Sequence, residues 1–213
     1  MNSNNKFVIT INRELGSGGR TVGRKLAEKL GVAFYDKALI KGLEEKFNLS
    51  IDEIERLKGR ETGWWAEIRR KLSWTDPDLY IMKEGRTPEV LETEEVFRAE
   101  TEIMKAIAKE ESCVIAGRSG FYIFREHPNH LSILIQATIP SRVARVAREQ
   151  NMTDEEARAT IDKVDRMREN YINRYTGSSR YDTRNYQLVL SMDELTEDDA
   201  VNIILDYIRN MSH

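Results

Sequence analysis

"INRELGSGGRTVGRKLAEKLG", residues 11–31, is the stretch that decides the fold of this chain. Its glycine-rich turn, Gly16-Ser17-Gly18-Gly19, follows an apolar run and precedes Val22, Leu26 and Leu30, which recur at helical spacing. A strand that ends in such a turn and opens a helix gathers backbone N–H groups and the positive helix end around one point. We therefore expect a phosphate-binding loop here, with a glycine turn that binds nothing as the alternative.

The turn departs from the usual pattern G-x-x-x-x-G-K-[ST], in which the lysine reaches the outer phosphates and the hydroxyl ligates magnesium. In one register Arg20 takes the lysine position and Glu14 takes that of the first glycine. In the other register, counted back from "LAEKLG", Gly19 takes the lysine position. The sequence leaves both registers open. In either one Arg20 supplies a permanent cation that can bond two phosphate oxygens.

Four apolar runs predict the strands of a sheet: residues 6–12, 113–117, 131–137 and 186–191. Continuous runs of Val, Ile and Leu, rather than alternating ones, are typical of strands covered on both faces, as in a parallel sheet. Helical patterns lie between these runs, so the chain is predicted to be a single α/β domain. Residues 49–85 carry Trp64, Trp65 and Trp74 without a strand-like run, and we expect a helical insert there.

Composition narrows the class of protein. The 213 residues are 40% hydrophobic and 32% charged with a net charge of −3, so no large basic field is available to hold a nucleic acid polymer. No apolar run approaches the length of a membrane span, and the N-terminus is polar. The single cysteine, Cys113, lies in an apolar run and is predicted to be buried in a reducing compartment. We expect a cytoplasmic protein that has no membrane partner.

Three stretches together resemble the cytidylate kinase-like family, a branch of the P-loop nucleoside monophosphate kinases. They are residues 11–40, "CVIAGRSGFYIF" at 113–124, and "RENYINRYTGSSRYDTRNYQLVL" at 168–190. The resemblance implies a three-layer P-loop NTPase fold with an acceptor-side insert at 49–85 and a lid at 153–185. It also implies transfer of a phosphoryl group from ATP, with Mg2+, to a nucleoside monophosphate. CMP and dCMP are the expected acceptors.

The resemblance also implies roles for individual residues. It assigns the donor phosphates to the loop and helix start, with the hydroxyl of the last member near magnesium: Gly16, Ser17, Gly18, Gly19, Arg20 and Thr21. Arg118 matches an acceptor-binding arginine, whereas Ser119 replaces the aspartate that follows it in cytidylate kinases. Because serine has no carboxylate, we do not expect position 119 to recognise cytosine as that aspartate does.

Further candidate site residues lie in the predicted lid and on the predicted acceptor side. Arg166 and Arg168 match the lid arginines best, and a solvated charged face is the alternative reading of that segment. Asp36 follows the short run "VAFY" and is predicted to orient the acceptor, to assist magnesium through water, or to cap a helix over 37–46.

Two other functions remain open at this point. A kinase for a small hydroxylated metabolite would use Asp36 to orient or deprotonate the hydroxyl. A nucleotide-binding module without catalysis would explain the missing lysine and the serine at position 119. The sequence does not predict the oligomeric state or the pathway.

Overall fold

The computed structural model describes residues 5–46, 48–58 and 93–211, which build one parallel sheet. Its strands lie in the order β2-β3-β1-β4-β5, and each pairs in parallel with its neighbours. They are β1 (Val8–Arg13), β2 (Ala33–Asp36), β3 (Cys113–Ala116), β4 (His130–Gln136) and β5 (Leu188–Ser191). The predicted α/β class and the predicted strands are confirmed.

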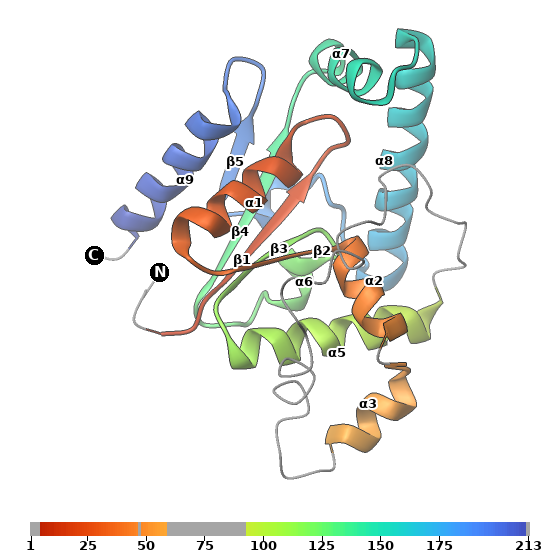
Figure 1. Ribbon diagram of the computed structural model, residues 1–213, viewed down its shortest axis with the longest axis vertical. Coiled ribbons are helices and arrows are strands. Elements are labelled where there is room, and N and C mark those ends of the chain that lie inside the picture. The colour runs from red at the N-terminus through yellow and green to blue at the C-terminus, as the bar shows by residue number, and fades with distance from the viewer. Residues whose placement is uncertain (1–4, 47, 59–92, 212–213) are drawn as a thin grey trace.

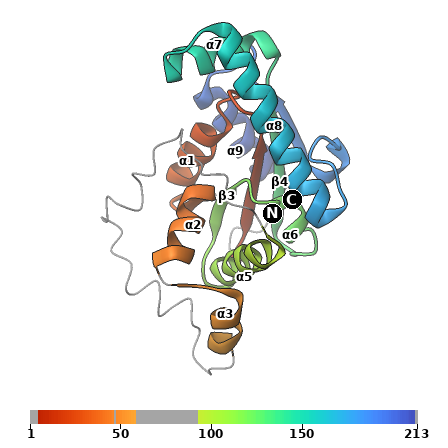
Figure 2. The same ribbon diagram turned by 90° about the vertical axis from the view of Figure 1, so that its right-hand side faces the viewer.

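Helices cover both faces of the sheet, so the fold has three layers (Figures 1 and 2). One face is covered by α1 (Gly19–Leu30) and α9 (Glu197–Asn210). The other face is covered by α2 (Lys37–Lys46), α3 (Ile51–Lys58), α5 (Glu94–Glu110) and α6 (Gly120–Ile123). Helices α7 (Ile139–Gln150) and α8 (Asp154–Thr176) form a hairpin at the end toward which β1 points, and a short 3-10 turn spans Thr183–Asn185.

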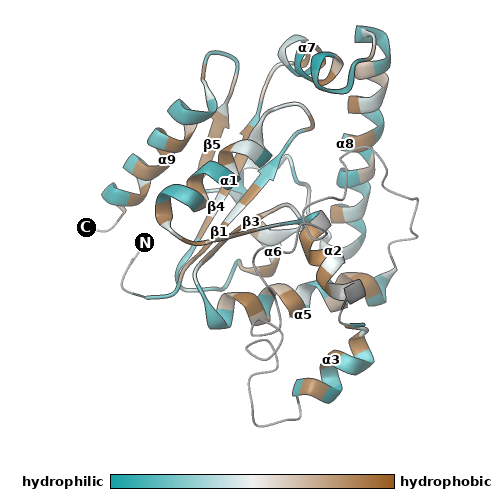
Figure 3. Ribbon diagram, viewed as in Figure 1, coloured by the Kyte–Doolittle hydropathy of each residue, from teal (hydrophilic) through white to brown (hydrophobic). Residues whose placement is uncertain are grey.

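The strands are buried on both sides, which explains their continuous apolar sequences. Along β1, Val8 packs into the core under α5, whereas Ile9 and Ile11 pack into the core under α1 and α9. All three are fully buried, and each stabilises the fold by about 1.5–3 kcal/mol relative to exposure. Figure 3 shows the same distribution, with apolar residues along the strands and on one side of each helix.

Helix boundaries follow local capping signals. Thr153 and Glu156 form a capping box at the start of α8. Thr196 caps α9 in the same way through Asp199, and the hydroxyl of Ser50 accepts the amide of Glu53 in α3. These side chains satisfy amides that the first helical turn leaves without partners.

The predicted insert lies mostly outside the described residues. Only residues 49–58 of it are described, where α3 packs against α5 and buries Ile54 completely. Trp64, Trp65 and Trp74 fall outside the described ranges. The insert therefore stays a prediction.

We predict that His130 makes the fold acid-sensitive. Its imidazole lies 2.7 Å from the hydroxyl of Thr10 and joins β4 to β1. Burial, with the nearby His127, lowers the pKa of His130 from 6.5 to about 4. Because the unfolded chain takes up this proton first, the free energy of unfolding should fall as pH drops from about 6.5 to 4, by about 3 kcal/mol.

Urea titrations across this pH range provide the measurement. A His130→Asn variant removes the titrating group, so its stability should change less with pH than that of the unaltered protein. Parallel profiles for the two proteins would contradict the assignment.

Candidate functional site

The glycine loop connects β1 to α1, and several of its amides have no hydrogen-bond partner within the described residues. Gly16 and Gly18 adopt φ angles of +82° and +79°, in the region that favours glycine. A Cβ on Gly16 would lie 2.8 Å from the Arg142 carbonyl oxygen, so the turn has no room for a side chain there. The amides of Gly18, Gly19 and Thr21 make no hydrogen bond within the described residues. Such a concave set of N–H groups at a helix N-terminus fits an anion.

Ser17 stabilises the loop from inside. Its hydroxyl donates to the Glu14 carbonyl oxygen at 2.9 Å, and its amide reaches the same oxygen at 3.3 Å. The side chain is buried. Its predicted contribution to phosphate binding stays a prediction.

Arg20 and Asp36 form an ion pair beside the loop. Arg20 Nε donates to Asp36 Oδ2 at 2.7 Å, and Asp36 Oδ1 accepts the amide of Leu39 at 3.0 Å. The carboxylate thus caps α2, as one reading of the sequence predicts, and also directs Arg20 toward the end of β2. Asp36 is buried, whereas Arg20 is half-exposed and remains accessible to a ligand.

Arg13, at the end of β1, is a site residue that the sequence reasoning missed. Its side chain contacts Gly19 and the α-carbon region of Gly117 at the end of β3. Burial, with the guanidiniums of Arg168 and Arg180, lowers the pKa of Arg13 to about 9. The sequence does contain a signal for Arg13. It precedes Gly19 by six positions, which is the spacing between the first glycine and the lysine of the usual pattern.

Helix α8 carries the two arginines that the sequence analysis assigns to a lid, and their positions differ. Arg168 Nη1 lies 3.4 Å from the Arg13 carbonyl oxygen, and burial together with Arg180 lowers the pKa of Arg168 to about 10. Arg166 is exposed, and within the described residues it makes no hydrogen bond or ion pair. Two positions on a helix are separated by about 200°, so the two side chains point to nearly opposite sides. The structure places Arg168, but not Arg166, beside the loop.

A buried charge network fastens the α7–α8 hairpin to the glycine loop. Asp165 accepts hydrogen bonds from Arg142 and Arg180, and from the amide of Leu15 at 3.2 Å. Arg142 also donates to the Leu15 carbonyl oxygen at 2.8 Å. Arg180 donates to the carbonyl oxygen of Arg13 and is fully buried. The loop conformation thus depends on side chains that follow it by more than a hundred residues in sequence.

Arg118 is held in the protein interior, which its sequence position does not indicate. Its Nη2 lies 2.7 Å from Glu100 Oε1, and both side chains are almost fully buried. Glu100 also accepts the Tyr171 hydroxyl at 3.1 Å. Ser119 begins α6 with φ +57°, and its hydroxyl is buried without a hydrogen-bond partner within the described residues. The acceptor role of Arg118 and Ser119 stays a prediction.

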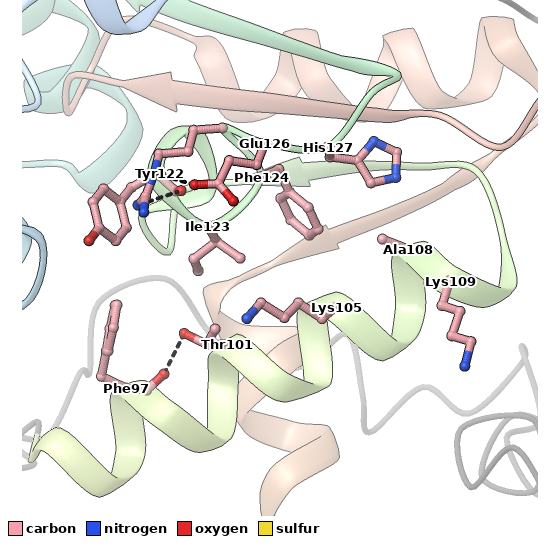
Figure 4. Close-up of a pocket in the computed structure, with 11 residues that line it drawn as sticks. Phe97, Thr101, Lys105, Ala108, Lys109, Tyr122, Ile123, Phe124, Glu126 and His127 are labelled. Carbon is pink, nitrogen blue, oxygen red and sulfur yellow. Dashed lines mark hydrogen bonds and ion pairs between the residues drawn. The ribbon is translucent and has the colours of Figure 1, made fainter. Parts of the chain in front are cut away.

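A cavity of about 440 Å³ lies between α5 and the segment from α6 to His127 (Figure 4). Phe97, Thr101 and Lys105 line it on the α5 side, and the Arg125 guanidinium covers the Tyr122 ring on the other. No residue of the glycine loop lines this cavity. It is therefore separate from the candidate phosphate site.

Three further observations bear on the class of protein. Cys113 is buried in β3 as predicted, and burial raises the pKa of its thiol. Among the described residues no three His, Cys, Asp or Glu side chains gather to hold a metal ion. Over the same residues, none of the helices combines the length and the apolar character needed to span a membrane.

Comparisons with known proteins agree with this arrangement. The chain is 25% identical over 201 residues to a cytidylate kinase from Sulfolobus acidocaldarius, covering 94% of this chain and 93% of that protein. It is 23% identical over 207 residues to shikimate kinase 1 from Yersinia pestis, covering 92% and 91%. These relatives support a nucleotide-dependent kinase and leave open whether the acceptor is CMP or a small metabolite.

Solved structures give the same fold. An uncharacterized protein from Eubacterium ventriosum superposes with a TM-score of 0.66 at 25% identity, covering 96% of this chain and 99% of that one. Shikimate kinase from Bacteroides thetaiotaomicron superposes with a TM-score of 0.51 at 15% identity, covering 95% and 98%, and supports the P-loop fold alone. The model of the cytidylate kinase-like family matches residues 8–194. The chain therefore belongs to the cytidylate kinase-like family.

Proposed function

We propose that this protein transfers the γ-phosphoryl group of ATP to a nucleoside monophosphate, with CMP or dCMP as the acceptor. The observation that carries the proposal is the convergence of guanidiniums on the glycine loop: Arg13 from β1, Arg20 from α1 and Arg168 from α8. Donor and acceptor are both phosphate anions in such a reaction. Catalysis then requires positioning and charge neutralisation more than a strong general base.

The residues fit ATP with Mg2+. The amides of Gly18, Gly19 and Thr21, which have no hydrogen-bond partner within the described residues, would hold the donor phosphates at the start of α1. The Thr21 hydroxyl would be a ligand of magnesium bound with ATP, and the metal would supply positive charge to the phosphates. Arg168 would stabilise charge on the transferring group, and Arg118 would bind the acceptor phosphate.

A small-metabolite acceptor is a second candidate, favoured by one specific observation. Asp36 is a buried carboxylate that lies between α2 and Arg20, close to the loop. Such a carboxylate can orient a hydroxyl group for phosphoryl transfer. The shikimate kinase relative is consistent with this reading.

An acceptor panel tests the proposal. The protein is incubated with Mg-ATP and CMP, dCMP, UMP, AMP or shikimate, and ADP formation is followed; a reaction without acceptor measures background hydrolysis. We expect turnover of CMP or dCMP, with only a modest preference over UMP. The reason is that Ser119 lacks the charge that would read cytosine, and buried polar partners are what produce strong discrimination.

The other outcomes separate the alternatives. Turnover of shikimate with no activity on nucleotides would favour the second candidate. ADP formation at the background rate with every acceptor would contradict both kinase proposals and favour a module that binds nucleotides without catalysis.

A further inference from the structure

The two registers of the glycine loop can be compared with the structure. In the usual pattern the first glycine precedes the lysine by six residues. With Gly19 at the lysine position, Arg13 occupies the position of that first glycine. Relative to the usual pattern, the cation then stands at the position of the first glycine, and a glycine stands at the position of the lysine. In the other register Glu14 would replace the first glycine, and its carboxylate is occupied by Arg142 and by the amide of Ala137.

The side chain of Arg13 and a side chain at position 19 exclude one another. A Cβ built on Gly19 would lie 2.6 Å from Cβ and 3.2 Å from Cγ of Arg13. Real Cβ atoms do not approach other carbon atoms so closely, and the nearer of the two is fixed to the backbone. Arg13 therefore fills the space from which a lysine at position 19 would extend.

The guanidinium of Arg13 lies in a strongly cationic environment. It rests against Gly117, where a Cβ would overlap with its nitrogen atoms. Within the described residues it makes no hydrogen bond and no ion pair. Arg168, Arg180 and Arg20 repel it, and Asp36 attracts it less strongly than Arg168 or Arg180 repels it. A partly desolvated cation that has like charges as neighbours is stabilised by an anion. The amides of the glycine loop that have no hydrogen-bond partner within the described residues offer the place for that anion.

We propose that Arg13 has exchanged roles with Gly19 and neutralises the donor phosphates in place of the missing lysine. This inference rests on the proposed function, because the anion is taken to be the phosphate chain of ATP. Arg20 then serves the acceptor side, where its ion pair with Asp36 directs it. The loop has kept its phosphate cation and has moved it to another position in the sequence.

Binding of Mg-ATP, measured by calorimetry on the full chain without any acceptor, tests the exchange. Arg13→Gln keeps most of the side-chain volume and removes the charge. It should weaken Mg-ATP binding by about 10- to 100-fold, as expected for the loss of a charged hydrogen bond. Adenosine, which has no phosphate, should bind both proteins equally. The control Arg24→Ala removes an exposed arginine from α1 and should bind Mg-ATP like the unaltered protein.

A pair of substitutions distinguishes the exchange from a merely structural role of Arg13. Gly19→Lys alone should bind Mg-ATP poorly, because the new side chain overlaps with Arg13. The double variant Arg13→Gly with Gly19→Lys restores the first glycine and the lysine of the usual pattern and should bind within about 10-fold of the unaltered protein, since charge and space are both recovered. This rescue requires that the two positions share one function.

Each outcome has a defined meaning. Unchanged Mg-ATP binding in Arg13→Gln, or a folded double variant that binds no better than the weaker single variant, would overturn the proposal. So would the absence of Mg-ATP binding in the unaltered protein. A protein that binds Mg-ATP through Arg13 but turns over no acceptor would instead contradict the proposed function and leave the exchange supported.

Discussion

Replacing Asp165 with alanine should lower the free energy of unfolding by about 3–5 kcal/mol, one of the two largest effects expected in this protein. The carboxylate is buried and accepts hydrogen bonds from Arg142 and Arg180, whose side chains are also buried. Without the Asp165 carboxylate, the two guanidiniums stay buried and still carry the free-energy cost of desolvation. They lose the anion that offsets this cost. Chemical denaturation in urea measures the change.

Asp162 on the same helix provides a matched control. Its carboxylate pairs with Arg158 at 3.0 Å, and both side chains are about half-exposed. Asp162→Ala should therefore cost less than about 1 kcal/mol, as exposed ion pairs usually do. Equal losses for the two variants would contradict the view that the buried network anchors the α7–α8 hairpin to the loop.

Arg118→Ala should be destabilising by a similar amount, about 3–5 kcal/mol, because it leaves the buried Glu100 carboxylate without this guanidinium. The double variant Arg118→Met with Glu100→Leu removes both charges and keeps similar volume. It should recover most of the lost stability, since buried ion pairs can be replaced by apolar residues at little cost. Thermal and urea unfolding of the three proteins provide the test. A loss below 1 kcal/mol in Arg118→Ala would contradict it.

The same variants separate the structural role of Arg118 from its predicted role in acceptor binding. Turnover lost in Arg118→Ala but regained in the stabilised double variant would indicate that the arginine acts only through the fold. A stable double variant with a raised KM for the acceptor would support direct binding. Activity of the single variant alone would not distinguish these cases.

The fold and the location of the site could be predicted from local patterns. Continuous apolar runs predict strands buried on both faces, and Thr153 with Glu156 predicts a helix start, because these signals depend on neighbours a few residues away. The glycine turn marks the loop for the same reason: φ angles near +80° at Gly16 and Gly18 exclude most other residues. The pairing of Asp36 with α2 also follows a local rule of helix capping.

The assignment of the charged residues could not be predicted in the same way. Arg118, Arg166 and Arg168 all match the family in sequence, yet one is held in a buried ion pair, one is exposed on the outer side of α8 and one lies beside the loop. What a guanidinium does depends on burial and on partners from other elements, and Glu100 lies on a different helix from all three.

The sequence by itself therefore determined a parallel α/β fold with a phosphate loop between the first strand and helix. Only the tertiary structure decided which charged side chains lie beside that loop. In the sequence Arg13 is one residue at the end of an apolar run. The fold places its side chain across Gly19 and against Gly117. Backbone conformation is set by short-range sterics, whereas the positions and charges of arginine side chains are set by contacts between elements that lie far apart in the sequence.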